Sequence, residues 1–234
     1  MYSGARSESW TIVVMTTAYC SGGRLVDEAD ILRERAREAS TSAIHVRLPR
    51  DSVGYIDAVS DEAQNEVHKL VAVLAEQIEL WAAQVAGGLR ALHAGGRTHR
   101  NLNPGNVYLD AKRQAIVGSY QCLKCARGPG CKTSLGRADC GSHIVMSPEL
   151  EDGGVVTTKA DIWAFGCCLY RWITGELPPI RGIPLNRVMQ RVPHAYSDKI
   201  RQALRMSLEP NPKARATAEE LFALLSKSSR RARK

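Results

Sequence analysis

The chain has 234 residues, of which 44% are apolar and 24% are charged. That apolar share is too high for a disordered chain, and the length suits one domain, so we expect a single globular domain with a real core. The longest uncharged apolar stretches, at 80–89 and 162–170, are about half of the roughly 20 residues that span a bilayer. The sequence therefore predicts no membrane-spanning segment.

The charge is basic, with 32 Lys and Arg against 24 Asp and Glu and a formal net charge of +8. Five of those eight charges fall in the tail at 226–234, so we expect no nucleic-acid partner. The apolar run at 12–15 is too short for a signal peptide, so secretion is not expected either. Without an oxidising compartment, the seven cysteines are predicted to be free thiols or metal ligands.

The first third of the chain predicts little regular structure. Residues 10–17 are rich in apolar and β-branched side chains and are followed by Ser-Gly-Gly at 21–23, which is typical of one short buried strand. From 26 to 74 the sequence is charged and irregular, with a patchy helical signal over 31–39. We expect this segment to be partly loop.

Regular elements are predicted from residue 78 onward. Apolar residues recur at steps of three and four, which predicts a helix from 78 that ends near Gly95 and Gly96. Short apolar runs at 107–109 and 115–117 predict a small hairpin.

Three more helices are predicted in the second half. A capping box at Thr158 and Asp161 precedes a helix over 162–174 that is apolar on all sides and must therefore be central and buried. Another helix follows Ser197, and a last one follows a capping box at Thr217 and Glu220.

Several segments, in the same order, resemble the protein kinase family. Residues 99–106, HRNLNPGN, resemble the catalytic loop H-R-D-L-x-x-x-N. The helix at 78–93 looks like helix E, and 14–25 look like strand five and the hinge. Three later segments are similar to the end of the activation loop, the start of helix F and the end of the kinase domain: 141–149 (GSHIVMSPE), 159–166 (KADIWAFG) and 208–215.

The resemblance covers residues 10–225 and implies an α+β, mostly α fold, a protein-kinase-like carboxyl lobe with the amino lobe largely missing. It divides the chain into a hinge-like strand, an insert, the carboxyl lobe and a basic tail, at 10–25, 26–75, 76–225 and 226–234. The insert is expected to be a tolerated surface loop rather than a partner-binding element. The catalytic-loop form Leu-x-Pro-x-Asn is similar to the Ser/Thr branch, and no G-x-G-x-x-G occurs in these residues.

The residues that carry the reaction in the family are replaced. Asn101 stands where the catalytic Asp belongs, and its amide has essentially no basicity. Asn103 replaces the lysine that steadies the transferred phosphate, and Ser119 replaces the D-F-G carboxylate that grips magnesium. The degenerate catalytic positions are His99, Arg100, Asn101 and Asn103, and the degenerate Mg-ATP positions are Asn106 and Ser119. The family implies ATP and magnesium, but we expect neither cofactor here.

The residues that resemble the family's scaffold are retained. The resemblance implies that Asp161 accepts backbone N–H bonds from the catalytic loop, that Glu149 and Arg215 form a buried ion pair, and that His99 packs beneath the loop. Such a pattern is typical of a pseudokinase, which we expect to act as a scaffold or regulator. Its expected partner is another protein, such as a kinase or signalling component, in the cytoplasm or alternatively the nucleus.

Cysteines crowd into the segment that resembles the activation loop, in the pattern C-x2-C-x5-C-x8-C formed by Cys122, Cys125, Cys131 and Cys140. The first pair has zinc spacing and the second does not, so a zinc site, with His143 as an alternative ligand, and reduced thiols both stay open. The remaining cysteines, Cys20, Cys167 and Cys168, are expected to be small core residues.

Two alternatives to a pseudokinase stay open. One is a fragment of an ATP-dependent protein Ser/Thr kinase, which transfers a phosphoryl group to Ser or Thr. The other is a zinc-stabilised basic binding module.

Overall fold

A computed structural model describes residues 22–44, 61–120, 124–125, 145–179 and 184–227. Its helices are α2 (Leu25–Ile44), α3 (Asp61–Ala94), α4 (Pro148–Glu151), α5 (Thr158–Thr174), α6 (Leu185–Gln190), α7 (Asp198–Ser207) and α8 (Ala218–Leu225), with a 3-10 turn η1 (Pro104–Asn106). Its strands are β1 (Arg97–Thr98), β2 (Val107–Leu109), β3 (Ala115–Val117) and β4 (Lys124–Cys125). Helices with a few short strands confirm the α+β, mostly α architecture.

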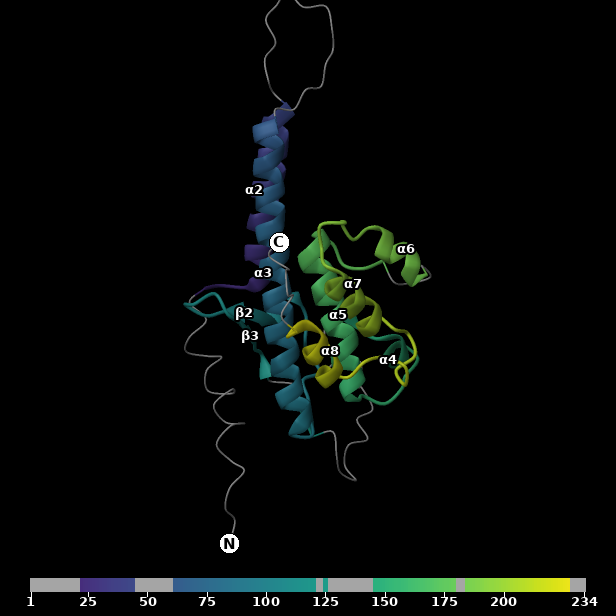
Figure 1. The fold of residues 1–234 in the computed structure, drawn as a ribbon. Helices are drawn as coiled ribbons and strands as arrows, with labels where there is room; N and C mark the ends of the chain where they lie inside the picture. The colour runs from purple at the N-terminus through teal and green to yellow at the C-terminus, as the bar shows by residue number, and fades with distance from the viewer. Residues whose placement is uncertain (1–21, 45–60, 121–123, 126–144, 180–183, 228–234) are drawn as a thin grey trace, which may run out of the picture.

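A long helical hairpin, formed by α2 and α3, occupies the segment predicted to be partly loop (Figure 1). The helical signal over 31–39 lies within α2, but the loop prediction is wrong for 26–30, 40–44 and 61–75, and α3 begins at Asp61 rather than at 78. Among the side chains of α2 described over 25–38, the buried ones are Leu25, Val26, Ala29 and Ala36. These four positions have helical spacing. Two of them are alanines, however, and many charged residues lie between them, so the apolar periodicity of this segment is weak.

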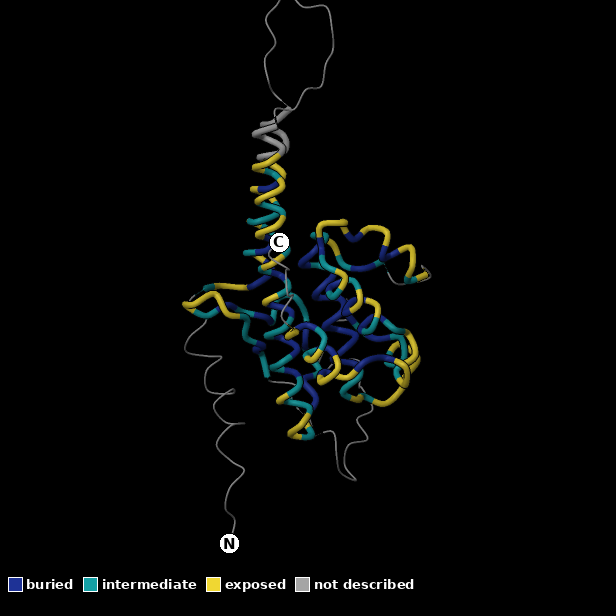
Figure 2. Tube along the Cα trace, in the orientation of Figure 1, coloured by how far each residue is buried: buried dark blue, intermediate teal, exposed yellow. Residues whose placement is uncertain are grey.

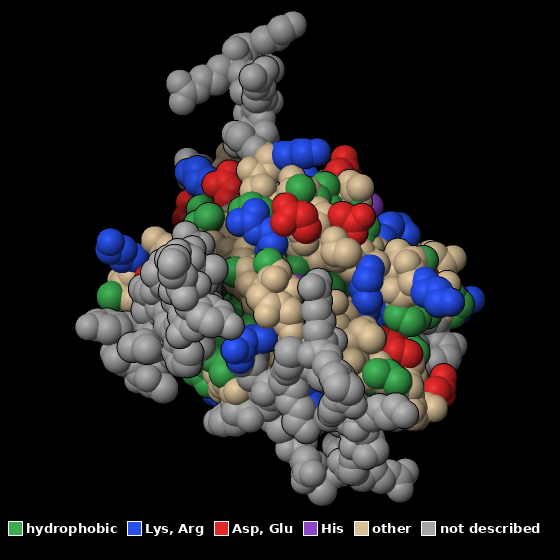
Figure 3. Space-filling model, turned by 90° about the horizontal axis from the view of Figure 1, so that it is seen from below, with side chains coloured by type: hydrophobic (Ala, Val, Ile, Leu, Met, Phe, Trp, Pro, Cys, Tyr) green, Lys and Arg blue, Asp and Glu red, His purple; other side chains and the backbone are tan. Residues whose placement is uncertain are grey.

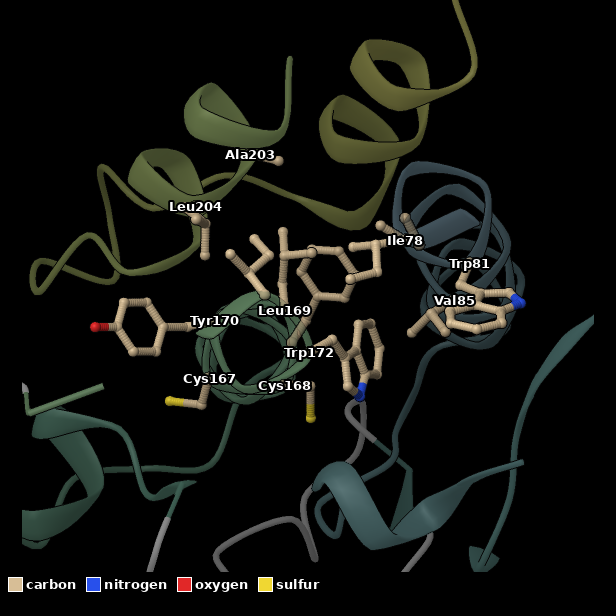
Figure 4. Packing of buried hydrophobic residues seen from close by; sticks show 14 of the residues in the cluster. Ile78, Trp81, Val85, Cys167, Cys168, Leu169, Tyr170, Trp172, Ala203 and Leu204 are labelled. Carbon is tan, nitrogen blue, oxygen red and sulfur yellow. The ribbon is translucent and has the colours of Figure 1, made fainter. Parts of the chain in front are cut away.

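Helix α5 is the centre of the domain and is buried on nearly every side, which confirms the prediction from its apolar sequence. Seen along its axis in Figure 4, it has Leu204 of α7 on one side and Trp81 of α3 on another, while Cys167 and Cys168 point away from α7. Both cysteines are fully buried, and burial raises the pKa of each thiol. They are core residues, as predicted.

The two ends of α5 are capped by different devices. The N-cap is Thr157, whose hydroxyl accepts from Lys159 N at 3.2 Å, so the predicted capping box at Thr158 and Asp161 is wrong by one residue at the cap. Asp161 has other hydrogen-bond partners, described below. At the other end, Gly175 adopts φ 82° and donates its N–H to the carbonyl of Arg171, which confirms the predicted stop.

Two small sheets lie beside α3. β2 pairs antiparallel with β3, which confirms the predicted hairpin, and β1 pairs antiparallel with β4. The segment just before α2 adds to the first sheet, because Gly22 N donates to the Leu109 carbonyl and Leu109 N to the Gly23 carbonyl, at 3.1 and 2.9 Å. The start of α2 is thereby tied to β2.

The last two helices begin where the sequence predicts. The Ser197 hydroxyl caps α7, and Thr217 and Glu220 form the predicted capping box of α8. α8 packs on α3, where the guanidinium of Arg90 lies 4.0 Å from the ring centre of Phe222. Figure 2 shows that buried residues gather around α5 and the adjoining half of α3, whereas most of the coloured residues in the projecting part of the hairpin are exposed or intermediate.

Several predictions fall outside the described residues: the strand at 10–17, Cys20, most of the cysteine-rich segment and the tail from 228. Within α3, the segment Asn65–Ala94 is long and apolar enough, by length and composition alone, to cross a membrane. A core helix meets the same criterion, and the carboxyl-terminal half of this one packs against the core with Trp81, Val85 and Leu89 buried.

Candidate functional site

The loop at 99–106 is anchored by a buried carboxylate. Asp161 on α5 accepts the backbone N–H of His99 through Oδ2 and that of Arg100 through Oδ1, both at 2.8 Å. Arg100 has φ 68°, a left-handed conformation that costs a non-glycine residue about 1 kcal/mol or more. The two charge-assisted bonds offset that cost, so α5 sets the path of the loop.

Two histidines surround the same carboxylate. The His93 ring, at the end of α3, lies with Nε2 2.8 Å from Asp161 Oδ2. His99 is fully buried, with Nε2 2.9 Å from the Gly118 carbonyl and Nδ1 accepting from Asn101 N at 3.2 Å. One ring nitrogen of His99 thus donates and the other accepts, which describes a neutral imidazole.

The surroundings of His99 agree with that neutral form. Burial lowers the pKa of His99, and this effect outweighs the opposing charge of Asp161 and the hydrogen bond to Gly118. The Tyr120 ring meets the imidazole edge-on at 5.1 Å, and burial raises the pKa of Tyr120 to about 12. His99 therefore lies beneath the loop and holds backbone in place, with both ring nitrogens occupied.

The asparagines of the loop bond to one another. The carbonyl of Asn101 accepts from Asn106 Nδ2 at 2.7 Å and from Asn103 Nδ2 at 3.1 Å. Asn103 also caps η1, since its Oδ1 accepts from Gly105 N at 2.9 Å. The resemblance to the family identifies Asn103 only as the replacement of a lysine. Asn-Pro-Gly is a turn-forming tripeptide, and that signal predicts the cap.

Asn106 and Ser119 lie at one corner. The Asn106 carbonyl accepts from Gly118 N at 2.9 Å, which brings Ser119 next to it. The Ser119 hydroxyl lies 3.3 Å from the Tyr108 hydroxyl, and Ser119 has φ 64°. Because its Nδ2 is held by Asn101, the atom that Asn106 could offer to a cation is Oδ1.

This donor set does not fit a magnesium nucleotide. Asn101, Asn106 and Ser119 present only neutral oxygens among the described residues of this corner, whereas Mg²⁺ in nucleotide sites is bound through one or two carboxylates. The amide of Asn101 likewise lacks the basicity to take a proton from a hydroxyl. The site offers a loop held by hydrogen bonds, with polar, uncharged side chains at positions 101, 103 and 119.

A second anchor ties α4 to the end of the domain. Arg215 is buried and donates to both oxygens of Glu149, at 2.7 and 2.8 Å. It also donates to the carbonyls of Lys159, Glu209 and Pro210, at 2.8 to 3.1 Å. Burial acts to raise the pKa of Glu149, but the hydrogen bonds and charge of Arg215 outweigh it and leave that pKa lowered.

The cysteine-rich segment is described only in part. Cys125 lies in β4, opposite Arg97 of β1, while Cys122, Cys131, Cys140 and His143 lie outside the described residues. Among the residues that the structure describes, no group of three or more His, Cys, Asp and Glu could hold a metal ion. The geometry of the predicted zinc ligands is therefore not described.

Two residues of the site are not among those predicted from the sequence. His93 contacts Asp161, and Tyr108 faces Ser119 while its ring occupies the space beside Gly118, where an added Cβ would lie 2.7 Å from the ring. A histidine in the last turn of the helix before the loop was a usable signal for the first. Nothing in the local sequence indicates the second, since it depends on the pairing of β2 with β3.

A buried helix whose carboxylate anchors an H-R-N-L loop, next to a hairpin and a Glu–Arg ion pair, defines a kinase-like carboxyl lobe. The family described as protein kinase domain matches residues 55–224, and the chain belongs to this family.

The proteins to which the chain is similar include serine/threonine-protein kinases. The chain is 28% identical over 207 residues to the inactive serine/threonine-protein kinase PLK5 of Mus musculus, covering 84% of this chain and 34% of that protein. It is 36% identical to the serine/threonine-protein kinase PDK1 of Cryptococcus neoformans over 48% of this chain and 9% of that protein. It is 29% identical to human ULK1 over 67% of this chain and 16% of that protein. The chain thus spans about a third or less of the length of these relatives.

Proposed function

We propose that this kinase-family chain is a catalytically impaired pseudokinase that acts as a scaffold or regulator of another protein. The observation that carries the proposal is the pair of neutral residues, Asn101 and Ser119, at the two positions where phosphoryl transfer needs carboxylates. Loss of a general base alone commonly costs a factor of about 100 to 10,000 in rate. Loss of the metal-binding carboxylate adds to it, although the two losses do not multiply.

The retained contacts support a role in binding. The anchors of Asp161 and Arg215 keep the loop and α4 in place without contributing to proton transfer. A domain that keeps such anchors presents a fixed surface to a partner. On the described part of the face seen in Figure 3, basic and acidic side chains are interspersed, which suits a protein partner better than a nucleic acid. A kinase or other signalling component, in the cytoplasm or the nucleus, is the partner class that we propose.

A second candidate is a fragment of an active Ser/Thr kinase. It is favoured by the names of the relatives, most of which are kinases, and by the short share of their length that this chain spans. For the zinc-stabilised binding module, the described residues contain no group of three or more His, Cys, Asp and Glu that could hold the metal.

The test measures binding and transfer on the same chain. We expect isothermal titration calorimetry with Mg-ATP to give no binding heat, and radiolabelled ATP to give no transfer to a generic protein substrate. We expect Ser119→Asp, alone and with Asn101→Asp, to increase the affinity for Mn²⁺ measured by electron paramagnetic resonance, because a carboxylate returns beside Asn106.

Magnesium-dependent turnover that disappears in Asn101→Ala would overturn the proposal and favour the second candidate. Stoichiometric zinc by elemental analysis, lost in a Cys122→Ser/Cys125→Ser variant, would favour the binding module instead.

A further inference from the structure

We propose that Tyr108 is a further determinant of the impaired metal binding, because its hydroxyl occupies the hydrogen-bonding position beside residue 119 that a cation would need. The inference rests on the proposed function, which ascribes the impairment to Asn101 and Ser119, and it adds a residue outside those two replaced positions. Two changes at this corner, rather than one, are then needed to obtain a cation site of full affinity.

The register of the small hairpin brings Tyr108 to this corner. Both neighbours of Tyr108 in β2 are fully buried, and successive side chains of a strand point to opposite faces, so Tyr108 points to the other face and is half-buried. In the pairing of β2 with β3, Tyr108 lies opposite Ile116. Gly118, two residues further along, is therefore its diagonal neighbour, and Ser119 follows directly. The strand pairing thus directs the phenol ring toward the end of β3.

Gly118 leaves the space that the ring occupies. A Cβ added at Gly118 would lie 2.7 and 2.8 Å from two carbons of the Tyr108 ring, so a larger residue there would push the ring away. Gly118 N also donates to the Asn106 carbonyl at 2.9 Å, which holds this piece of backbone next to Asn106. The tyrosine ring is thus packed on the same short segment that carries Ser119.

The contact between residues 108 and 119 would strengthen if a carboxylate stood at 119. The two hydroxyls lie 3.3 Å apart, which is longer than the roughly 2.7–2.8 Å typical of O–H···O hydrogen bonds. In the change Ser119→Asp, the carboxyl carbon takes the place of the serine oxygen, and its oxygens lie roughly 1.2 Å further out. One of them then comes within hydrogen-bond distance of the Tyr108 hydroxyl. A bond to a charged acceptor is about twice as strong as one between neutral groups.

Such a bond competes with a cation for the same carboxylate. The phenol O–H donates to an oxygen lone pair that Mg²⁺ or Mn²⁺ would otherwise take, so it stabilises the metal-free form. The neighbouring Asn106 offers a neutral oxygen, since its Nδ2 already donates to the Asn101 carbonyl at 2.7 Å. The Tyr108 hydroxyl therefore lowers the metal affinity that a carboxylate at position 119 can give.

Manganese titration of the full chain, followed by electron paramagnetic resonance, tests the proposal. We expect Ser119→Asp/Tyr108→Phe to bind Mn²⁺ about three- to tenfold more tightly than Ser119→Asp, because phenylalanine keeps the ring and removes only the donor. Ser119→Asp/Tyr196→Phe is the matched control. Tyr196 is a buried tyrosine just before α7, outside this corner, so the loss of its hydroxyl should leave the Mn²⁺ affinity unchanged.

The outcomes separate this inference from the proposed function. Equal Mn²⁺ affinity of Ser119→Asp with and without Tyr108→Phe overturns the inference alone, as does a failure of both variants to bind Mn²⁺. A gain with Tyr108→Leu but not with Tyr108→Phe assigns the effect to the size of the ring and equally overturns it. Mn²⁺ binding by Tyr108→Phe with Ser119 unchanged would support the inference and contradict the proposed function, which ascribes the loss to Ser119. Circular dichroism verifies that each variant keeps its helices.

Discussion

Replacing Asp161 by asparagine tests whether one buried carboxylate holds the loop at 99–106. The two oxygens of Asp161 have three nitrogen partners at 2.8 Å: the backbone N–H groups of His99 and Arg100, and the ring of His93. Asparagine has the same size, but it has an NH2 group in place of one of the two carboxylate oxygens. This NH2 group is a hydrogen-bond donor and would face a backbone N–H, which is also a donor. One buried backbone N–H then has no acceptor.

The magnitude follows from these contacts. A hydrogen bond to a charged group contributes about 1.5–3 kcal/mol, and a buried donor left without an acceptor costs about 1–3 kcal/mol. We therefore expect Asp161→Asn to lower the free energy of unfolding by about 3–5 kcal/mol. This is a large part of the roughly 5–15 kcal/mol by which a whole domain is typically stable.

Urea unfolding followed by far-UV circular dichroism measures this loss. Asp152→Asn is the matched control, because Asp152 is exposed at the end of α4 and its replacement should change stability by less than about 0.5 kcal/mol. If Asp161→Asn costs less than about 1 kcal/mol, the backbone of the loop does not depend on this carboxylate and the reasoning is refuted.

Three further substitutions test other contacts by the same measurement. Glu149→Gln should cost about 3 kcal/mol at neutral pH, because Arg215 stays buried beside a neutral partner. The folded-state pKa of Glu149 is lowered, so in the wild type its contribution to stability is present above the ordinary pKa and is lost as the pH falls through the folded-state pKa. The Glu149→Gln variant should therefore lose less stability than the wild type on acidification. An equal dependence of the unfolding free energy on acidic pH in the two proteins would contradict this. Thr217→Ala should cost about 1 kcal/mol through loss of the α8 cap, and no change would mean that the cap contributes nothing. Gly166→Ala should cost about 1–3 kcal/mol by overpacking, because the added Cβ would lie 2.8 Å from Leu208 in the core; a more stable variant would show that Leu208 can move.

The sequence predicts the buried half of the fold better than the projecting half. α5 was predicted because large apolar side chains occupy all its sides, and α8 because Thr217 and Glu220 form a capping box. Only the part of α2 over 31–39 was predicted, because the contact of α2 with α3 depends partly on alanines, whose burial changes an apolar pattern little. A helix that packs against one neighbouring helix buries a narrow face, so its apolar periodicity is weak although the tertiary contact stabilises it.

The site shows the same division. The replacements at Asn101 and Ser119 are visible in the sequence, since they depend only on aligning a motif. The contact of His93 with Asp161 and that of Tyr108 with Ser119 are not, because residues from different elements meet only after the chain has folded. Thr157 was missed as the cap of α5 because the adjacent Thr158 offers the same hydroxyl, and the two are distinguished only by backbone dihedrals.

The left-handed backbone at Ser119 bears on what a carboxylate would cost at this position. Serine is less favourable at φ 64° than aspartate or asparagine. The change Ser119→Asp would therefore reduce local backbone strain instead of adding to it. The main chain next to Asn106 thus does not disfavour a carboxylate at this position.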